Sequence, residues 1–314
     1  MPLLTTLVAA LIQLQGSPLS GGRISGSASI RLERARGGDT PVLTLASPGG
    51  VVRLLIDSGA SSTMVTPALA RRLGLPSRAL ASGEIELAGG GSGCGALHPR
   101  RTRLPTLELA GGEQQGQLRL SGIEALLLPV AALPDDVDGV LGAPSLRQLP
   151  LWIDPQHNRL ALGAAALQAA RLDDARAPTR PRPMVTIPLR WQRGVPLLEL
   201  ESPGGAVPAL ADTGAEGLFI RPQLAARLRP LGPGRPLRLV GFCGVQTAEL
   251  RRYVGLSLAG AGRPAGPSAA VEAIRIDNPI FQQLGVEAIV GQELLRVHPQ
   301  LWRLDSQPPQ LELR

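Results

Sequence analysis

The sequence predicts an all-β fold made of two similar halves, and three observations support this expectation. Glycine (38 residues) and proline (30 residues) are frequent in the 314-residue chain. Few windows show helical periodicity, which favours short strands joined by turns. Apolar residues make up 44% and charged residues 18%, a composition typical of globular proteins with buried cores. The stretch LLIDSGA at 54–60 returns as ALADTGA at 209–215, which indicates an internal duplication.

The repeat extends well beyond these two stretches. Residues 41–73 match 196–228 at an offset of 155, and farther along the offset falls to 149, consistent with one net deletion of six residues. The pairs that match at the second offset include Cys94-Gly95 with Cys243-Gly244 and Gly142 with Gly291. We therefore expect an N-terminal lobe at 23–168 and a C-terminal lobe at 184–314, joined by an Arg-, Pro- and Asp-containing linker at 169–183.

Within the first unit the elements can be placed in order. Apolar runs at 41–46 and 51–56 flank a Ser-Pro-Gly-Gly turn and predict a hairpin. Residues 67–74 predict a short helix with Pro67 in its first turn and Gly74 at its end. Further strands are expected at 62–65, 84–87, 104–109, 122–130, 140–141, 151–153 and 159–162, and one or two helical turns at 144–149.

The first 22 residues lie outside the repeat and have two interpretations. Residues 3–14 are mostly apolar and have the length of a signal-peptide core, which would make the protein periplasmic or secreted. Otherwise this stretch is an N-terminal strand in a sheet that bridges the halves, and the protein is cytoplasmic. No other segment approaches the roughly 18 uninterrupted apolar residues of a membrane-spanning helix, so we expect no integral membrane span.

The charge pattern argues against a nucleic-acid partner. All 32 basic residues are Arg, and the net charge is +7. The arginines are scattered, and the chain has only three Trp, three Phe and one Tyr, whereas nucleic-acid binding favours clustered basic residues with aromatic side chains for stacking. We therefore expect a solvated basic surface, with attraction to acidic partners left open. The glycines at 89–95 cannot form a P-loop, because the chain contains no lysine.

The two copies of the repeated stretch each deliver an aspartate after an apolar run. Approximate two-fold docking of the halves would set Asp57 beside Asp212. Carboxylates about 3 Å apart repel each other by on the order of 5 kcal/mol at an effective dielectric near 20, so the pair would share one proton and titrate as a unit. Such a pair can activate a water molecule and protonate a carbonyl group. The residues expected to brace the turns and to admit backbone amides are Ser58, Gly59, Thr213 and Gly214.

At these residues the chain resembles aspartic proteases. The motifs are Asp-Ser-Gly-Ala at 57–60 and Asp-Thr-Gly-Ala at 212–215, followed by apolar-apolar-Gly signatures that end at Gly142 and Gly291. Two lobes in one chain resemble pepsins. In contrast, Ala60 and Ala215, and the lack of a tyrosine in the first expected flap, resemble retropepsins. The resemblance implies two pseudo-symmetric β-barrel-like lobes with an active-site cleft between them.

The resemblance also implies a function. It indicates an aspartic endopeptidase acting on peptide or protein substrates, with Asp57 and Asp212 catalytic and with no cofactor or metal. A monomer is expected, because both aspartates belong to one chain. The missing hydroxyl groups at Ala60 and Ala215 predict an optimum of about pH 4 to 6. Two alternatives remain open: a peptide-binding module with this fold and little or no turnover, and a dormant precursor in which residues 1–38 occupy the cleft.

Symmetric lobes imply two flaps over the cleft. By position, the flap residues that would contact substrate are Gly93, Cys94, Gly95, Gly241, Phe242, Cys243 and Gly244. The first flap is expected to be a mobile hairpin, with arms at 84–87 and 104–109 around a glycine-rich tip. Its cysteine and that of the second flap could pair across the axis, but two unpaired, small apolar side chains are favoured.

The remaining candidate residues carry weaker signals. His98, His157 and His298 have no metal-ligand spacing to one another or to cysteine, which favours solvated or structural roles. Trp152 and Trp302 stand at matching places beside the closing strands. We expect both tryptophans to pack in the core or between the lobes.

Overall fold

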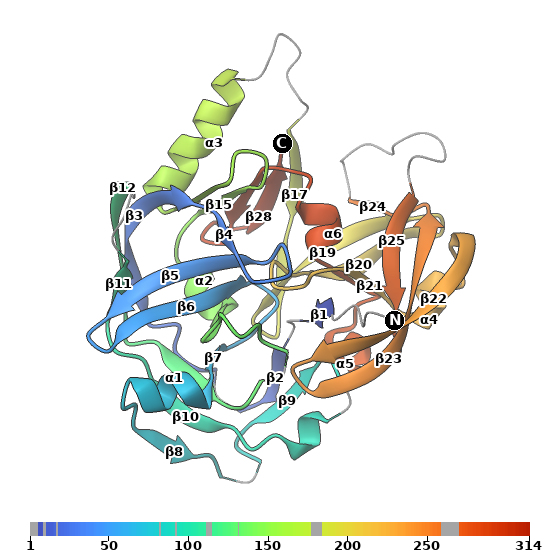
Figure 1. Ribbon diagram of the computed structural model, residues 1–314. Helices are drawn as coiled ribbons and strands as arrows, with labels where there is room; N and C mark the ends of the chain where they lie inside the picture. Colours follow the sequence, from blue (N-terminus) through green and yellow to red (C-terminus); the bar gives the residue numbers. More distant parts are fainter. Residues whose placement is uncertain are drawn as a thin grey trace.

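In the computed structural model the described part of the chain forms three β-sheets with helices around them (Figure 1). The structure describes residues 6–8, 11–16, 18–81, 83–91, 93–110, 115–130, 132–176, 184–258 and 270–314. The prediction of an all-β fold is confirmed, because strands dominate and the described α-helices other than α3 have only four to six residues. None of the described helices combines the length and the apolar character needed to cross a membrane.

The largest sheet contains strands from both halves of the chain. Its described strands form an open order with two free ends, so they do not close into a barrel. In spatial order they are β17 (Val185–Pro188), β28 (Gln310–Leu313), β27 (Gln300–Arg303), β15 (Leu151–Asp154), β16 (Arg159–Leu162), β3 (Arg23–Arg31), β12 (Gln115–Ser121), β11 (Leu107–Leu109), β5 (Pro41–Ser47), β6 (Gly50–Asp57), β14 (Gly139–Gly142), β7 (Thr63–Val65), β13 (Glu124–Leu127), β10 (Arg100–Arg103) and β8 (Ser77–Ala79), with β4 (Glu33–Arg34) beside β5.

The second large sheet belongs to the C-terminal half, apart from one short N-terminal strand. Its strands are β1 (Thr6–Val8), β22 (Arg229–Gly241), β23 (Gly244–Val254), β25 (Ala270–Arg275), β21 (Leu218–Ile220), β26 (Ala288–Val290), β20 (Gly205–Ala211), β19 (Val195–Ser202) and β18 (Arg190–Gln192), with β24 (Ser257–Leu258) beside β19. The third sheet pairs β2 (Leu11–Gln15) with β9 (Glu86–Gly89). The helices are α1 (Pro67–Arg72), α2 (Ala143–Leu146), α3 (Ala164–Arg176), α4 (Pro222–Ala225), α5 (Pro279–Leu284), α6 (Gln292–Leu295) and the 3-10 helix η1 (Cys94–Ala96).

The same local arrangement delivers an aspartate in each half. In the first half, β5 and β6 form the expected hairpin, and the buried strand β14 runs parallel to β6 with Gly142 opposite Asp57. In the second half, β19 and β20 form the hairpin and β26 runs parallel to β20. Glycine at 142 has a packing reason, because a Cβ there would lie 2.7 Å from the backbone of Ser62. In each half, the strand that ends at the aspartate is therefore held by a hairpin partner on one side and a parallel strand on the other.

The halves are joined by direct strand pairing. β15 pairs antiparallel with β27, with Trp152 opposite Leu301. Trp152 and Trp302 are at most 1% exposed, and the indole Nε1 of Trp302 donates to Gln300 Oε1 at 2.9 Å. The prediction that both tryptophans pack in the core or between the halves is confirmed.

The largest sheet, which the two halves share, contains none of the described strands of the first 22 residues. Along the chain, its first strand is β3. Instead, β1 pairs parallel with β22, and β2 pairs antiparallel with β9. The described part of the N-terminal stretch thus forms strands, as one interpretation expected, but these strands do not join the sheet that the two halves share. They pair with the segments expected to form the flaps, and a signal peptide at 1–22 remains a prediction.

Helix α3 occupies part of the expected linker. Its sequence, AAALQAARLDDAR, consists mostly of strong helix formers. Ala166, Ala169 and Ala170 are buried in one apolar cluster with Trp152. Residues 169–176 are thus helical rather than extended linker, while 177–183 lie outside the described residues.

Candidate functional site

Asp57 and Asp212 lie side by side at the ends of the two equivalent strands. Asp57 is the last residue of β6, and Asp212 directly follows β20. Both residues are 0% exposed. A Cβ on Gly59 would overlap the carboxyl group of Asp212, so the backbone of one aspartate turn contacts the aspartate of the other. The glycine is therefore required by this close approach.

Hydroxyl groups tie the two aspartate turns together. Ser58 Oγ donates to the carbonyl of Ala211 at 2.8 Å and accepts from the amide of Thr213 at 3.0 Å. Thr213 Oγ1 makes the reciprocal pair, donating to the carbonyl of Ile56 at 2.7 Å and accepting from the amide of Ser58 at 3.0 Å. All these groups are buried, so their hydrogen bonds fix the two aspartate turns relative to each other.

Burial raises the pKa of both aspartates. The pKa of Asp212 rises from 3.8 to about 6, with burial as the largest cause. The pKa of Asp57 is raised well above its ordinary value, first by burial and then by the nearby charge of Asp212. Because the two groups titrate as a pair, the site holds one proton in a pH range that begins near the lower of the two values.

The carboxyl oxygens of this pair differ in their hydrogen bonds. Gly214 donates its amide to Asp212 Oδ1 at 2.8 Å. Among the described residues, neither oxygen of Asp57 nor Oδ2 of Asp212 has a hydrogen-bond partner, although all three are buried. Buried polar atoms without partners reduce stability, and they are common where a reacting molecule takes the missing hydrogen bonds.

The second flap is a long hairpin formed by β22 and β23, with Gly241 opposite Gly244 at its tip. Phe242 is 1% exposed and belongs to an apolar cluster that includes Ala60, next to the first aspartate turn. A Cβ on Gly241 would overlap the backbone of Gly90. The tip of the second flap is thus packed between the first flap and the first lobe.

A disulfide between Cys94 and Cys243 joins the two flap tips, with their Cα atoms 4.4 Å apart. The prediction that favoured two unpaired, small apolar side chains is therefore wrong. Backbone hydrogen bonds flank the disulfide: Cys243 donates to the carbonyl of Gly90 at 2.7 Å, and Gly93 donates to the carbonyl of Cys243 at 2.6 Å. Equivalent positions in the repeat placed the cysteines symmetrically, but only the packing of the flaps brought them into contact.

The first flap differs from the expected mobile hairpin. β9 pairs with β2, whereas β11, the strand in the expected returning arm, pairs with β12 and β5. The expected arms at 84–87 and 104–109 therefore do not pair with each other in the described part of the chain. Gly93, Cys94 and Gly95 lie at the start of η1, and the disulfide ties this tip to the second flap.

Two polar residues that sequence reasoning missed hold the first flap. Gln246 Oε1 accepts from the amide of Gly91 at 2.8 Å and from Asn278 Nδ2 at 2.7 Å. Asn278 Nδ2 also donates to the carbonyl of Gly91 at 3.1 Å. Both side chains border a cavity of about 410 Å³ that is also lined by Ala88. The repeat gave no signal for them, because the counterpart of Gln246 is the apolar Leu97.

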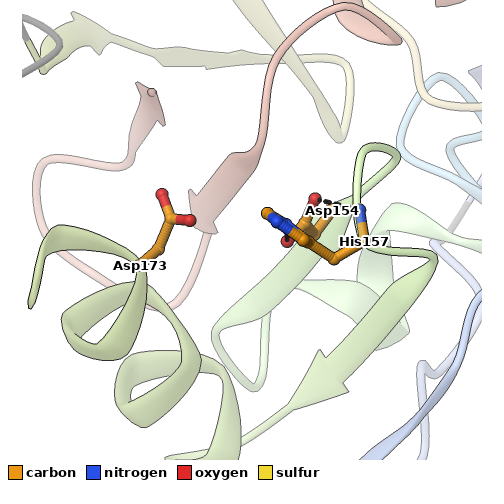
Figure 2. Close-up of side chains that lie close together, drawn as sticks. All are labelled: Asp154, His157 and Asp173. Carbon is orange, nitrogen blue, oxygen red and sulfur yellow. Dashed lines mark hydrogen bonds and ion pairs between the residues drawn. The ribbon is translucent and has the colours of Figure 1, made fainter. Parts of the chain in front are cut away.

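His157 has no histidine or cysteine partner at metal-ligand spacing in the sequence, but in the structure it lies close to two aspartates. Its Nδ1 lies 2.7 Å from Asp154 Oδ2, and Asp173 of α3 points at the same place, so that ligand-type atoms of all three residues lie within 4.8 Å of one another (Figure 2). Asp154 Oδ1 accepts from the backbone amides of Gln156 and His157, each at 3.0 Å. Because both oxygens of Asp154 are used in the turn between β15 and β16, we interpret the cluster as structural.

A family model described as aspartyl protease matches residues 43–145, which run from β5 to α2 and include Asp57. The resemblance to aspartic proteases is thereby confirmed. No curated protein sequence matches the chain. Similar solved structures are conglutin gamma, a basic 7S globulin from lupine seeds (11% identity, TM-score 0.49, covering 93% of this chain and 95% of that chain), and basic 7S globulin from soybean (11% identity, TM-score 0.45, covering 94% and 95%).

The segment matched by the aspartyl protease model contains one complete aspartate turn. It spans β6, the brace Ser58 and the parallel strand β14. The second aspartate lies outside the matched segment, and it reaches the same site through the equivalent strands β20 and β26. The geometry of the pair therefore depends on both halves of the chain.

Proposed function

We propose that the protein is an aspartic endopeptidase in which Asp57 and Asp212 are the catalytic residues. The observation that carries the proposal is the pair of buried carboxyl groups, braced by Ser58 and Thr213, with three oxygens that have no partner among the described residues. Two neighbouring carboxyl groups in a dry site destabilise a fold. Such an arrangement is useful for chemistry, because each carboxyl group can be tuned for proton transfer.

The carboxyl pair can perform each proton transfer of peptide hydrolysis. The ionised carboxylate removes a proton from water, and the resulting hydroxide attacks the carbonyl carbon of the peptide bond. The protonated carboxyl group donates its proton to the carbonyl oxygen. When the tetrahedral intermediate breaks its C–N bond, the proton taken from water passes from its carboxyl group to the leaving amine, and a hydroxyl group of the intermediate returns a proton to the other carboxylate. Because the two groups titrate as a pair, one carboxyl group is ionised as the base while the other holds the shared proton as the acid.

The proposed pH dependence follows from the same pair. Catalysis needs one proton on the two carboxyl groups, and burial places the lower pKa near 6. Access of substrate and water to the site reduces the desolvation that raises both pKa values. We therefore keep an optimum of about pH 4 to 6 as the expected working range.

We further propose that an internal duplication produced two lobes, at 23–168 and 184–314, that act together on one peptide. Support comes from the matching order of elements, because β5, β6, α1 and β14 correspond in sequence to β19, β20, α4 and β26. Each lobe supplies one aspartate and one flap. A single chain thereby contributes the complete site, which supports a monomer as the working form.

A peptide-binding module without turnover is the second candidate function. The observation that favours it is β2, a strand from the N-terminal stretch that pairs with β9 of the first flap. This candidate needs an accessible strand edge but not the carboxyl pair. Binding of a peptide by a protein that never cleaves it would support the module and exclude the protease.

Separate Asp57→Asn and Asp212→Asn variants test the protease proposal. Each should reduce the cleavage of a peptide library at pH 5 by at least about 100-fold, because neither variant can complete the general acid–base pair. Asp305→Asn is the matched control, since Asp305 lies in a distant turn and pairs with Arg303. Peptide cleavage is measured by mass spectrometry, and unfolding curves check that all variants fold. Full activity in either dyad variant would contradict the proposal.

A further inference from the structure

The tips of the two flaps fit together through glycines. In the first flap, a Cβ on Gly91 would lie 2.5 Å from the backbone of Cys243, and a Cβ on Gly93 would lie 2.7 Å from it. In the second flap, a Cβ on Gly241 would lie 2.2 Å from the backbone of Gly90. Only glycine permits the backbones to approach so closely at these three positions. The two tips are therefore shaped to lie against each other, independently of the disulfide that joins them.

The disulfide limits how far the two tips can separate. The Cα atoms of Cys94 and Cys243 lie 4.4 Å apart, and a disulfide keeps two such atoms within about 7 Å of each other. An extended polypeptide with its side chains is about 10 Å thick, as the spacing of packed β-sheets shows. The joined tips therefore prevent the interior of a polypeptide from passing between them.

The tip of the second flap is also part of the cover of the aspartate pair. Phe242 and Cys243 are at most 2% exposed, and both belong to the apolar cluster that contains Ala60, the last residue of the first aspartate motif. Asp57 and Asp212 are 0% exposed. A substrate can reach the two carboxyl groups only after part of this cover moves, and the disulfide restrains one such part.

The two cysteines differ in their access to solvent. Cys94 is half-buried and lines the cavity of about 410 Å³ between the first flap and the second half, whereas Cys243 is 2% exposed and does not line it. The wall of this cavity also carries the polar side chains of Thr247, Asp277 and Gln283. Among the described residues, Gln283 Oε1 has no hydrogen-bond partner although it is buried. The cavity therefore has room and hydrogen-bonding groups for a small polar thiol beside Cys94.

We propose that Cys94 is a thiol–disulfide exchange site, and that exchange with a dithiol reductant separates the flap tips and admits the interior of an unfolded polypeptide to the aspartate pair. This inference rests on the proposed protease function. With the disulfide intact, few molecules have an open site, and the apparent affinity for a polypeptide substrate is reduced by that fraction. Reduction should therefore raise both the binding and the cleavage of such a substrate.

The exchange proceeds in two steps. A thiolate of the dithiol attacks Cys94 Sγ from the cavity, the bond to Cys243 Sγ breaks, and Cys243 leaves as a thiolate that takes up a proton. The second thiolate of the reductant then attacks the reductant's own sulfur in this mixed disulfide, and Cys94 leaves in the same way. The dithiol is oxidised to a cyclic disulfide, and its two electrons reduce the two cysteines to thiols.

The first experiment measures the cleavage of fluorescently labelled casein, whose own thiols are alkylated, by the full-length protein at pH 5. The protein is used either untreated or after reduction with dithiothreitol at about pH 8, where thiolates form. We expect reduction to raise the rate of cleavage at least about 10-fold, because it increases the fraction of molecules with separated tips. Equal rates before and after reduction overturn the proposal.

The double variant Cys94→Ser/Cys243→Ser is the matched control. It should cleave casein without reduction at the rate of the reduced protein, and dithiothreitol should not change that rate. The chain contains no other cysteine, so the reductant acts on the unmodified protein through this disulfide. Urea unfolding checks that the reduced protein and the variant are folded under the assay conditions. A folded variant with the low activity of the untreated protein contradicts the proposal.

A second experiment identifies the sulfur that is attacked and needs no variant. The untreated protein is incubated with glutathione at about pH 8 and trapped with excess maleimide, and its peptides are mapped by mass spectrometry. We expect glutathione on Cys94 and maleimide on Cys243, in at least about 10-fold excess over the reverse pattern, because exchange depends on access to the attacked sulfur. Equal amounts of the two patterns, or glutathione mainly on Cys243, contradict the assignment of Cys94.

Casein binding separates this inference from the protease proposal. Binding of the labelled casein to Asp212→Asn is measured by fluorescence anisotropy before and after reduction. Tighter binding after reduction, with no cleavage by the unmodified protein in either state, would support the exchange site and contradict the protease. Cleavage at the same rate in both states, with equal binding, would contradict the exchange site and leave the protease standing.

Discussion

At the level of single residues, burial of the aspartate pair tunes both carboxyl groups for proton transfer but lowers the stability of the fold. Asp57 and Asp212 are completely buried, and the pKa of each is raised by that burial. Ionising a buried carboxyl group is less favourable in the folded protein than in the unfolded chain, where the group is solvated. The hydrogen bonds of Ser58 and Thr213 hold the two turns in place against this penalty.

The stability of the protein should therefore depend on pH through Asp212. Its pKa is about 6 in the folded protein against an ordinary 3.8, so the stabilising contribution of the protonated group is complete below about pH 4 and is lost as the pH rises through 6. Asp212→Asn should remove this loss and stabilise the protein at pH 7 by up to on the order of 3 kcal/mol, with little change at pH 4. Urea unfolding at both pH values measures the effect, with Asp305→Asn as control. The same pH slope in the variant and in the unmodified protein would contradict it.

The residues of the dyad were predictable from the sequence, whereas those that contact β2 were not. Asp57, Ser58 and Gly59 belong to a short local pattern that the chain writes twice. Ser61 and Arg193 have no such pattern, since each acts on a partner far away in the chain. Their roles follow from which strand lies against them.

At the level of elements, the flaps are where expectation and structure differ most. The second flap is the long hairpin of β22 and β23, but the first flap has β2 as the partner of β9. A strand edge accepts any chain that presents free amides and carbonyls in register. Strand partners therefore depend on which edge is adjacent in the folded molecule, and the apolar pattern of 84–87 predicted a strand without predicting its partner.

Reduction of the disulfide should loosen both flap tips. Cys94 and Cys243 are separated by 149 residues in the sequence, and cross-linking so long a loop contributes up to about 4 kcal/mol by restricting the unfolded chain. A reductant should lower the urea midpoint of the unmodified protein and leave a Cys94→Ser/Cys243→Ser double variant unchanged. Thiol titration should find no free thiol in the non-reduced protein. Two free thiols without reductant would contradict the disulfide.

At the level of the whole molecule, the site exists only where the halves meet. The pairing of β15 with β27 and the tie from Glu216 to residues 39–40 hold the halves together. Thr40 Oγ1 also donates to Glu216 Oε1, so this carboxylate is well supplied with hydrogen bonds. Because the aspartate pair takes one residue from each half, any loss of docking changes the geometry of the pair.

Glu216→Gln should weaken this docking. The amide has one NH₂ group where the carboxylate has a second acceptor oxygen, so a backbone amide loses its partner, at a cost of about 1 to 3 kcal/mol. Glu108→Gln is the matched control, since Glu108 is largely exposed and its ion pair with Arg119 is long, at 3.7 Å. Urea unfolding gives the stability difference, and peptide cleavage should decline with it. Equal stabilities of the two variants would contradict a docking role for Glu216.

From the amino-acid order alone follow the all-β class, the repeated aspartate turns and the likeness to aspartic proteases, because each rests on short apolar runs that end in the same few residues. The partner of β9, the pairing of Cys94 with Cys243, and the contacts of Ser61 and Glu216 came only from the folded molecule. Local patterns encode strands and turns through neighbours along the chain. Which edges and side chains then meet depends on contacts between residues that are distant in the sequence.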